Sequence, residues 1–321
     1  MGSMIAILRR QPILGAVLIA VLLYFFGLAS IDGFGSTFTL RSMLILAALL
    51  GIASVGQTLV IILGGIDLSI PFIVGFANVV AAQLYGNGMN FALVCLIVAV
   101  LALAIGAFNG ALSARLGLHP LIVTLGVGTF VQGAVLLWTA GFPSGSAPQY
   151  ISNFVSIGGS IGPLPFPGVV PAFLVMTLAV AFFLARTPFG RRLYALGSNP
   201  PAARYALIDP VWMWAATFAL SALFAAIAGV LLLGFTGSAY ADVGKPYLFQ
   251  TIAAVVVGGT ALVGGRGSYL GTFVGAIVLT EINTLLIGLG FQPSAVQAAL
   301  GAVIILLVSL YGREAHLREQ I

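Results

Sequence analysis

The chain has 321 residues, of which 61% are hydrophobic and only 6% are charged, and its formal net charge is +5. Soluble domains carry about 25% charged residues, so this composition excludes a soluble globular protein and indicates a polytopic membrane protein. The basic residues are scattered between apolar runs, which excludes the basic patch of a nucleic-acid-binding protein.

The apolar runs are long and lack the alternating pattern of outer-membrane strands, so they predict an all-α fold. We expect a helical bundle of about ten transmembrane helices, forming a single domain over residues 1–321. The first run follows Arg9 and Arg10 and is long for a signal-peptide core. We expect a retained helix there, with cleavage near Ala29 and Ser30 as the alternative. The expected spans are 13–31, 42–63, 70–85, 91–114, 120–140, 168–185, 211–235, 247–263, 268–290 and 294–311.

The distribution of basic residues predicts the orientation of the bundle. An even number of spans places both termini on one side, and the positive-inside rule makes that side cytoplasmic. The outer loops then hold only Arg41 and Lys245. The inner side holds Arg9, Arg10, Arg115, Arg186, Arg191, Arg192, Arg204, Arg266, Arg313 and Arg318. We therefore expect a multi-pass protein of the bacterial inner membrane.

The stretch Gly64-Gly65-Ile66-Asp67-Leu68-Ser69 interrupts an apolar run. Two glycines and the following Pro71 predict that one helix stops near Leu63 and the next begins near Ser69. Asp67 and Ser69 are expected as N-cap residues, with Pro71 in the first turn. A glycine-interrupted apolar segment also points to a transport site, so a direct contact of Asp67 with substrate is the alternative.

Glycine patterns predict where helices pack closely. The pairs Gly106-x-x-x-Gly110 and Gly271-x-x-x-Gly275 suit close helix contacts, with chance as the alternative in a chain of 41 glycines. The spans 70–85 and 247–263 are short, and each adjoins a glycine-rich break. Paired breaks of this kind are what an internal repeat would leave, and two unrelated turns are the alternative.

Two long loops remain. The outer loop, 141–167, is rich in Gly, Pro and Ser and is expected to cover the outer mouth of the bundle. In the inner loop, 186–210, Ser198 or Asn199 can cap a short helix that runs to about Ile208. Such a helix suits docking to another protein, and a basic loop that only fixes orientation is the alternative.

The motifs of catalysis and metal binding are missing from the sequence. It has no phosphate-binding loop and no zinc-protease motif. Cys95 is the only cysteine, and His119 and His316 lack companions at ligand spacing. Glu281 is the only acid deep within an apolar span, so paired carboxylates for a proton relay are absent. We expect no enzyme activity, no metal and no cofactor bound by this chain.

Several stretches together resemble the permease subunits of bacterial sugar ABC importers of the ribose, xylose and galactofuranose group. They span nearly the whole chain in the order of that family. They are Leu63-Gly-Gly-Ile-Asp-Leu-Ser69, His119-Pro-Leu-Ile-Val-Thr-Leu-Gly126, Arg186-Thr-x-x-Gly-Arg191, Tyr194-Ala-x-Gly197, Asn199-x-x-Ala-Ala-Arg204, Val257-Gly-Gly-Thr-x-Leu-x-Gly-Gly-x-Gly267, Pro293-x-x-x-Gln297 and Gly301.

The resemblance implies a type II-like ABC importer permease that moves a monosaccharide, such as a pentose or a furanose, into the cytoplasm. It implies a second permease, two cytoplasmic ATPases where ATP and Mg act, and a periplasmic sugar-binding protein. It also implies that Asn199–Ile208 is a coupling helix seated in a cleft of the ATPase. The implied coupling residues are Arg186, Arg191, Arg192, Asn199, Ala202, Ala203 and Arg204.

The chain departs from that family at informative places. Leu207 and Gln132 stand where members often carry Gly and Arg, respectively, so the coupling helix can end differently and the permease pair can be identical or paralogous. A same-fold permease for a nucleoside, branched amino acid or furanone signal is an alternative function, as is a stand-alone secondary carrier. A carrier would have no use for a docking helix.

Polar groups within the spans are the candidates for a substrate path, because a sugar needs partners for its hydroxyls. Phe130 and Trp138 offer apolar faces to a sugar ring. Amides in membrane helices also bond neighbouring helices, which is the alternative role. Glu281 is the sharpest candidate, because a carboxylate in the membrane needs a partner. The candidates are Gln57, Asp67, Asn78, Asn109, Thr124, Phe130, Gln132, Glu281 and Asn283.

Overall fold

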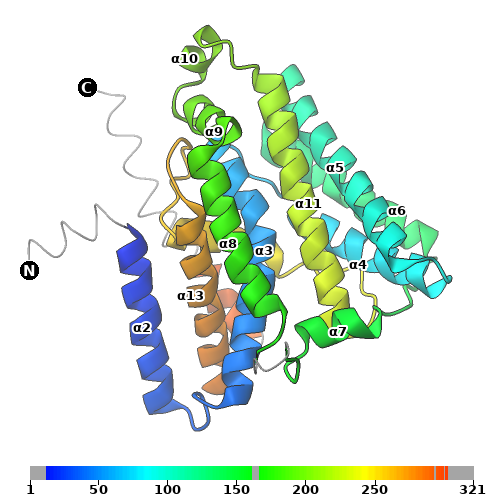
Figure 1. Ribbon diagram of the computed structural model, residues 1–321, viewed down its shortest axis with the longest axis vertical. Helices are drawn as coiled ribbons and strands as arrows, with labels where there is room; N and C mark the ends of the chain where they lie inside the picture. Colours follow the sequence, from blue (N-terminus) through cyan, green and yellow to red (C-terminus); the bar gives the residue numbers. More distant parts are fainter. Residues whose placement is uncertain (1–11, 161–165, 293, 300, 303–321) are drawn as a thin grey trace, which may run out of the picture.

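The computed structural model describes residues 12–160, 166–292, 294–299 and 301–302, and within these ranges it is helical without strands (Figure 1). Seven of the described helices are long and apolar enough to cross a membrane. These are α2 (Pro12–Ser30), α3 (Thr37–Leu63), α5 (Phe91–Leu116), α6 (Pro120–Trp138), α8 (Val169–Arg186), α11 (Pro210–Thr236) and α13 (Tyr269–Gly288). The shorter helices are α4 (Ile70–Gly86), α7 (Gln149–Val155), α9 (Pro188–Ser198), α10 (Pro200–Tyr205) and α12 (Tyr247–Val257).

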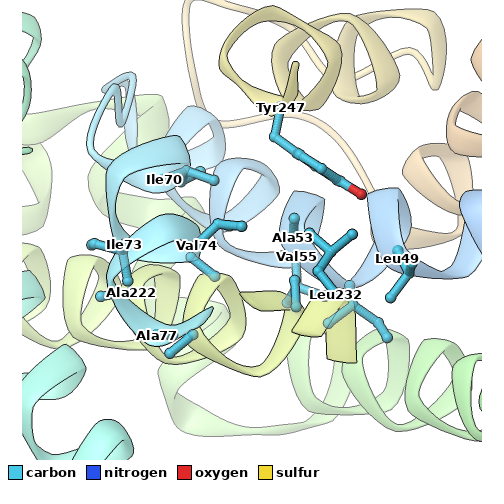
Figure 2. Packing of buried hydrophobic residues seen from close by; sticks show 14 of the residues in the cluster. Leu49, Ala53, Val55, Ile70, Ile73, Val74, Ala77, Ala222, Leu232 and Tyr247 are labelled. Atoms are coloured by element: carbon cyan, nitrogen blue, oxygen red, sulfur yellow. The ribbon is translucent and has the colours of Figure 1, made fainter. Parts of the chain in front are cut away.

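Helix α3 is the centre of the bundle. Almost all of it is buried, and it packs against α11, α13, α12 and α8. Helices α4 and α11 complete the core, and Figure 2 shows Val74 of α4, Leu232 of α11 and Tyr247 of α12 gathered around Ala53 of α3. A helix that is apolar on all sides can be buried on all sides, which is why α3 shows no amphipathic pattern in the sequence.

The predicted glycine contacts are present. Gly106 and Gly110 of α5 lie against the backbone of Phe218 and Trp214 in α11, where a Cβ atom would not fit. Gly271 and Gly275 of α13 lie in the same way against α12. Small residues let two helix backbones approach closely, so these pairs hold α5 on α11 and α13 on α12.

The bundle has two ends that differ in charge. Helices α9 and α10 mark one end, at the top of Figure 1, and α7 marks the other. Of the described arginines, Arg41 lies nearer the α7 end, where its Nη1 donates to the carbonyl of Ile157 at 3.2 Å. The other described arginines lie toward the α9 end, as the positive-inside pattern predicts: Arg115, Arg186, Arg191, Arg192, Arg204 and Arg266.

Nine of the expected spans appear as helices, with shifted ends. The span expected at 247–263 stops at Val257, because Gly259, Gly264 and Gly265 adopt positive φ and turn the chain back. Most of the expected span 294–311 lies outside the described residues. The loop 141–167 contains α7, and the inner loop contains α9, neither of which the sequence analysis predicted.

The two glycine-rich breaks meet at the α9 end. The amide of Gly265 donates to the carbonyl of Ile62 at 2.8 Å, and Gly264 lies beside Gly64. Helix α9 covers this junction, with the Tyr194 hydroxyl donating to the carbonyl of Gly267 at 2.8 Å. Burial raises the pKa of the Tyr194 phenol above its ordinary value. Both short spans, α4 and α12, therefore depend on one shared junction.

Candidate functional site

The break between α3 and α4 is built around the buried carboxylate of Asp67, which is only 2% exposed. Gly64 ends α3 in the left-handed conformation, at φ 96°, and lets the chain turn. One carboxylate oxygen of Asp67 accepts bonds from the amide of Ser69 at 2.8 Å and from its hydroxyl at 2.5 Å. The other accepts from the hydroxyl of Ser221 in α11 at 2.7 Å. Asp67 thus ties the break to α11.

The expected capping of α4 is partly wrong. Ser69 is the N-cap residue and Pro71 lies in the first turn, as predicted, but the Ser69 side chain makes no cap bond. Its hydroxyl donates to Asp67 instead, and Asp67 reaches the amide of Ser69 rather than an amide inside α4. The buried carboxylate takes the hydroxyl because a charged acceptor forms the stronger bond.

Three of the sequence candidates meet at this break. The amide nitrogen of Asn109 in α5 donates to the hydroxyl of Ser69 at 3.1 Å. The hydroxyl of Thr124 in α6 accepts from the amide of Leu68 at 3.0 Å. With Asp67, these contacts fasten the break to α5, α6 and α11. The sequence analysis did not identify Ser221, because a single serine in an apolar span does not indicate a functional role.

The chain between α11 and α12 crosses part of the bundle without helical structure. This unwound segment, residues 237–246, lies along α4. The amide of Tyr240 donates to the side-chain oxygen of Asn78 at 2.9 Å. Further along, Gly244 meets the carbonyl of Pro71, and no Cβ atom would fit between them. The N-termini of the short helices α4 and α12 therefore lie close together inside the bundle.

Three polar side chains form a cluster on the side of the unwound segment that faces away from the protein core. The side-chain nitrogen of Gln132 in α6 donates to one carboxylate oxygen of Asp242 at 2.6 Å. The ammonium of Lys245 donates to the other oxygen at 2.7 Å. We call Gln132, Asp242 and Lys245 the Asp242 cluster. The sequence analysis missed Asp242 and placed Lys245 in an outer loop, because an unwound segment has the composition of a loop.

The remaining candidates on α3, α4 and α6 do not share one site. Asn78 bonds both Tyr240 and the carbonyl of Gly229 in α11, so it joins α4 to α11. Gln57 in α3 is fully buried, and its side-chain nitrogen and oxygen have no partner among the described residues. Phe130 is 76% exposed and lines an apolar groove with Leu68 and Leu125.

The candidates on α13 lie apart from the break. Figure 1 shows α13 beside α2 and α3, whereas α5 and α6 lie on the other side of the bundle. Glu281 is 5% exposed and borders a small cavity with Tyr24 and Met43. One of its carboxylate oxygens has no partner among the described residues. Asn283 is half-buried on the same helix. The structure therefore separates Glu281 and Asn283 from Asp67.

Residues 199–208 form an exposed tip at the α9 end, and the expected coupling residues lie on this tip or on α8 and α9. Asn199 caps α10 by accepting from the amide of Ala202 at 3.1 Å, as predicted. The expected end at Ile208 is wrong, because α10 stops at Tyr205 and Leu207 takes the left-handed conformation, at φ 58°. Ala203 is buried, whereas Tyr205 and Leu207 are more than nine-tenths exposed. Arg204 is exposed on the tip, and Arg186, Arg191 and Arg192 are exposed on α8 and α9.

An all-helical bundle with broken spans at its centre and an irregular segment beside them is the architecture of a membrane permease. The chain belongs to the family described as the permease component of branched-chain amino acid transport systems, whose model matches residues 39–308. It is accordingly a multi-pass inner-membrane protein and a transport subunit.

The curated relatives confirm the resemblance to sugar import permeases. The chain is 33% identical to a fructose import permease of Rhizobium meliloti over 315 residues, covering 94% of this chain and 86% of the relative. It is 33% identical to a ribose import permease of Bacillus subtilis, covering 83% of this chain and 82% of the relative. It is 31% identical to an autoinducer 2 import permease of Klebsiella pneumoniae, covering 84% and 82%.

Proposed function

We propose that this chain is the membrane-spanning subunit of an ATP-binding-cassette importer that moves a monosaccharide, such as a pentose or a furanose, into the cytoplasm. The proposal rests on the similarity to ribose and fructose import permeases. Its main structural support is the exposed tip at α10. ATP and Mg act in a separate ATPase, and this chain binds neither.

The tip fits a docking role. Tyr205 is 91% exposed and Leu207 is 93% exposed, although both are large apolar side chains. Exposed apolar side chains beside arginines suit an interface with a partner protein. Residues 199–208 would enter the ATPase, with Arg204 pairing with acidic groups there. A secondary carrier has no partner to receive such a tip.

Two further partners complete the proposed assembly. A second permease, identical or paralogous, would pair with this chain so that the sugar passes between the two bundles. A periplasmic sugar-binding protein would dock at the α7 end. Closure of the ATPase pair would then bias the bundle between inward-open and outward-open states, which requires the partners to bind those states with different affinities.

The break at Asp67 has a positioning role in this proposal. Its carboxylate already accepts three hydrogen bonds from Ser69 and Ser221. A carboxylate offers about four lone-pair sites, so most of its capacity is taken. Asp67 would hold the start of α4 in place rather than bind the sugar. Gln57 and Glu281 remain candidates for contacts that form in the other state of the transport cycle.

Purification of the chain from its native membrane in mild detergent, followed by mass spectrometry, tests this assignment. We expect an ATPase and a sugar-type binding protein to copurify, and the presence or absence of a second permease decides between a heterodimer and a homodimer. Recovery of the chain alone, with uptake intact in ATP-free vesicles, would show a secondary carrier instead.

A second cargo class follows from one comparison. Because one relative imports autoinducer 2, a furanone-type signal is the alternative substrate. Competition for uptake between unlabelled sugars, a nucleoside and a furanone would separate the classes. We expect only monosaccharides to compete.

A further inference from the structure

The unwound segment places charged side chains deep in the bundle. Helix α4 has 17 residues, which corresponds to a length of about 25 Å. Tyr240 contacts Asn78 near the middle of α4, and Gly244 contacts Pro71 at its inner end. The residues between them therefore lie roughly 12 to 25 Å from the outer end of α4. The hydrocarbon core is about 30 Å thick, so Asp242 lies within its depth, and the ammonium of Lys245, bonded to Asp242 at 2.7 Å, lies at a similar depth.

These charged side chains point away from the protein core. Ala241, Gly244 and Tyr247 are buried, and they recur every three residues along the segment. Between them, the side chain of Lys245 is 69% exposed and that of Asp242 is 29% exposed. Charged groups at membrane depth do not face lipid, and irregular backbone there borders protein or a water-filled cavity. This surface therefore faces an aqueous path or a second subunit.

The chemistry of the surface suits a neutral, hydroxylated ligand. Asp242 and Lys245 balance each other in charge, so the cluster does not select an anion or a cation. A carboxylate accepts bonds from hydroxyls, and an ammonium with three donors has two left after bonding Asp242. Two exposed aromatic residues flank the cluster in the chain, Tyr240 before Asp242 at 58% and Phe249 after Lys245 at 56%. Binding sites for small molecules combine apolar rings with a few polar groups in this way.

We propose that the Asp242 cluster binds hydroxyl groups of the sugar along its path between the two permeases. The inference rests on the proposed function and names the residues that contact the substrate. Gln132 positions the carboxylate of Asp242 from α6, and Asp242 in turn positions the ammonium of Lys245. Because hydroxyl partners distinguish one sugar epimer from another, the cluster determines selectivity as well as passage.

The test compares two sugars in proteoliposomes that contain the whole transporter. The sugars are epimers at one hydroxyl, and both are substrates of the wild type. We expect Asp242→Asn and Lys245→Met to change the ratio of the two uptake rates by about tenfold, since a hydrogen bond to a charged group is lost. The exposed Asp32 lies in the loop before α3, and Asp32→Asn serves as the matched control that leaves the ratio unchanged.

A structural role for the cluster predicts a different result. If the cluster only joins two permeases, both variants would reduce uptake of both sugars equally and would lower the dimer fraction in native mass spectrometry. An unchanged ratio would overturn the proposal, whether or not overall uptake falls. The charge-swapped pair Asp242→Lys with Lys245→Asp retains an ion pair, so it keeps the dimer while the ratio still changes. A wild type that imports no sugar in the presence of ATP would instead overturn the proposed function.

Discussion

At the scale of single residues, two positions combine an unusual conformation or environment with a specific role. Leu207 holds the left-handed conformation that closes α10, with its amide bonded to the carbonyl of Arg204 at 3.0 Å. Glycine adopts this conformation without strain, whereas other residues pay about 1–2 kcal/mol. The Leu207 side chain is 93% exposed, so packing within the described residues does not offset this cost, as fits the proposed contact with an ATPase. Asp67, in contrast, is satisfied within the chain.

Comparing Leu207→Gly with Leu207→Ala separates the effect of backbone strain from the effect of the Leu207 side chain on docking. The substitution relieves the left-handed backbone, so we expect slower hydrogen exchange at the amides of residues 207 and 208, whose bonds close α10. We also expect weaker copurification of the ATPase. Leu207→Ala is the control, because it removes the side chain but keeps the strain. Faster exchange in Leu207→Gly than in Leu207→Ala would contradict the account.

Ser221→Ala tests the bond that ties the break to α11. Its hydroxyl donates to the buried carboxylate of Asp67, and loss of a bond to a charged group costs about 1.5–3 kcal/mol. Ser113→Ala is a matched change, because among the described residues that buried hydroxyl bonds only the carbonyl of Asn109 in its own helix, at 2.8 Å. Thermal unfolding in detergent should show a clear drop for Ser221→Ala and little change for Ser113→Ala. Equal drops would count against a special role for Asp67.

At the scale of helices, the close contact of α5 with α11 depends on glycine. Gly110 lies against the backbone of Trp214 and Ala215, which cannot move aside as a flexible side chain can. Gly133 in α6 has no atom within 4 Å of the place where a Cβ would stand. The same substitution should therefore have opposite effects at these two positions.

We expect Gly110→Ala to destabilise the bundle by about 1–3 kcal/mol through overpacking. Gly133→Ala should stabilise its helix by about 0.5–1 kcal/mol, because alanine loses less backbone entropy. Unfolding midpoints in the same detergent give the comparison. A stabilising effect of Gly110→Ala would show that α5 and α11 are not in contact there.

Run length and helix breakers were enough to predict most spans, because a membrane requires long apolar helices. The glycines at 64–65 correctly predicted the end of a helix, and those at 106 and 110 correctly predicted a close contact between two helices. Helix α9 was not predictable as a separate element, since its buried Gly190, Leu193 and Leu196 are sparse in a polar loop. The unwound segment was missed for a related reason. Its depth depends on contacts with Asn78 and Pro71, which no local pattern encodes.

At the scale of the whole molecule, the polar sites lie on two different sides of the bundle, and the exposed tip lies at one of its ends. The break at Asp67 and the Asp242 cluster lie toward α4 and α6, whereas Glu281 lies toward α2. The sequence analysis listed Asp67, Gln132 and Glu281 together as candidates for one path, because the sequence alone does not show which helices surround a polar residue in a membrane span. The exposed tip at α10 lies at the basic end. Helix α9, which precedes α10, packs on the junction of the two breaks.

Arg204→Glu reverses one charge at the tip and should uncouple ATP hydrolysis from transport. We expect sugar uptake to fall by at least about tenfold, because like charges across an interface disfavour docking, while the amount of protein in the membrane stays the same. Arg115→Glu makes the same change at the same end but away from α10, and it should retain uptake. Wild-type uptake in Arg204→Glu would contradict the docking assignment.

The most direct test of the central claim is uptake of a labelled monosaccharide into proteoliposomes that contain this chain, its copurified permease and ATPase partners and the binding protein. The account predicts accumulation against a gradient that requires ATP on the cytoplasmic side and stops when either the ATPase or the binding protein is left out. Uptake by the purified chain alone, at the same rate with and without ATP, would contradict it.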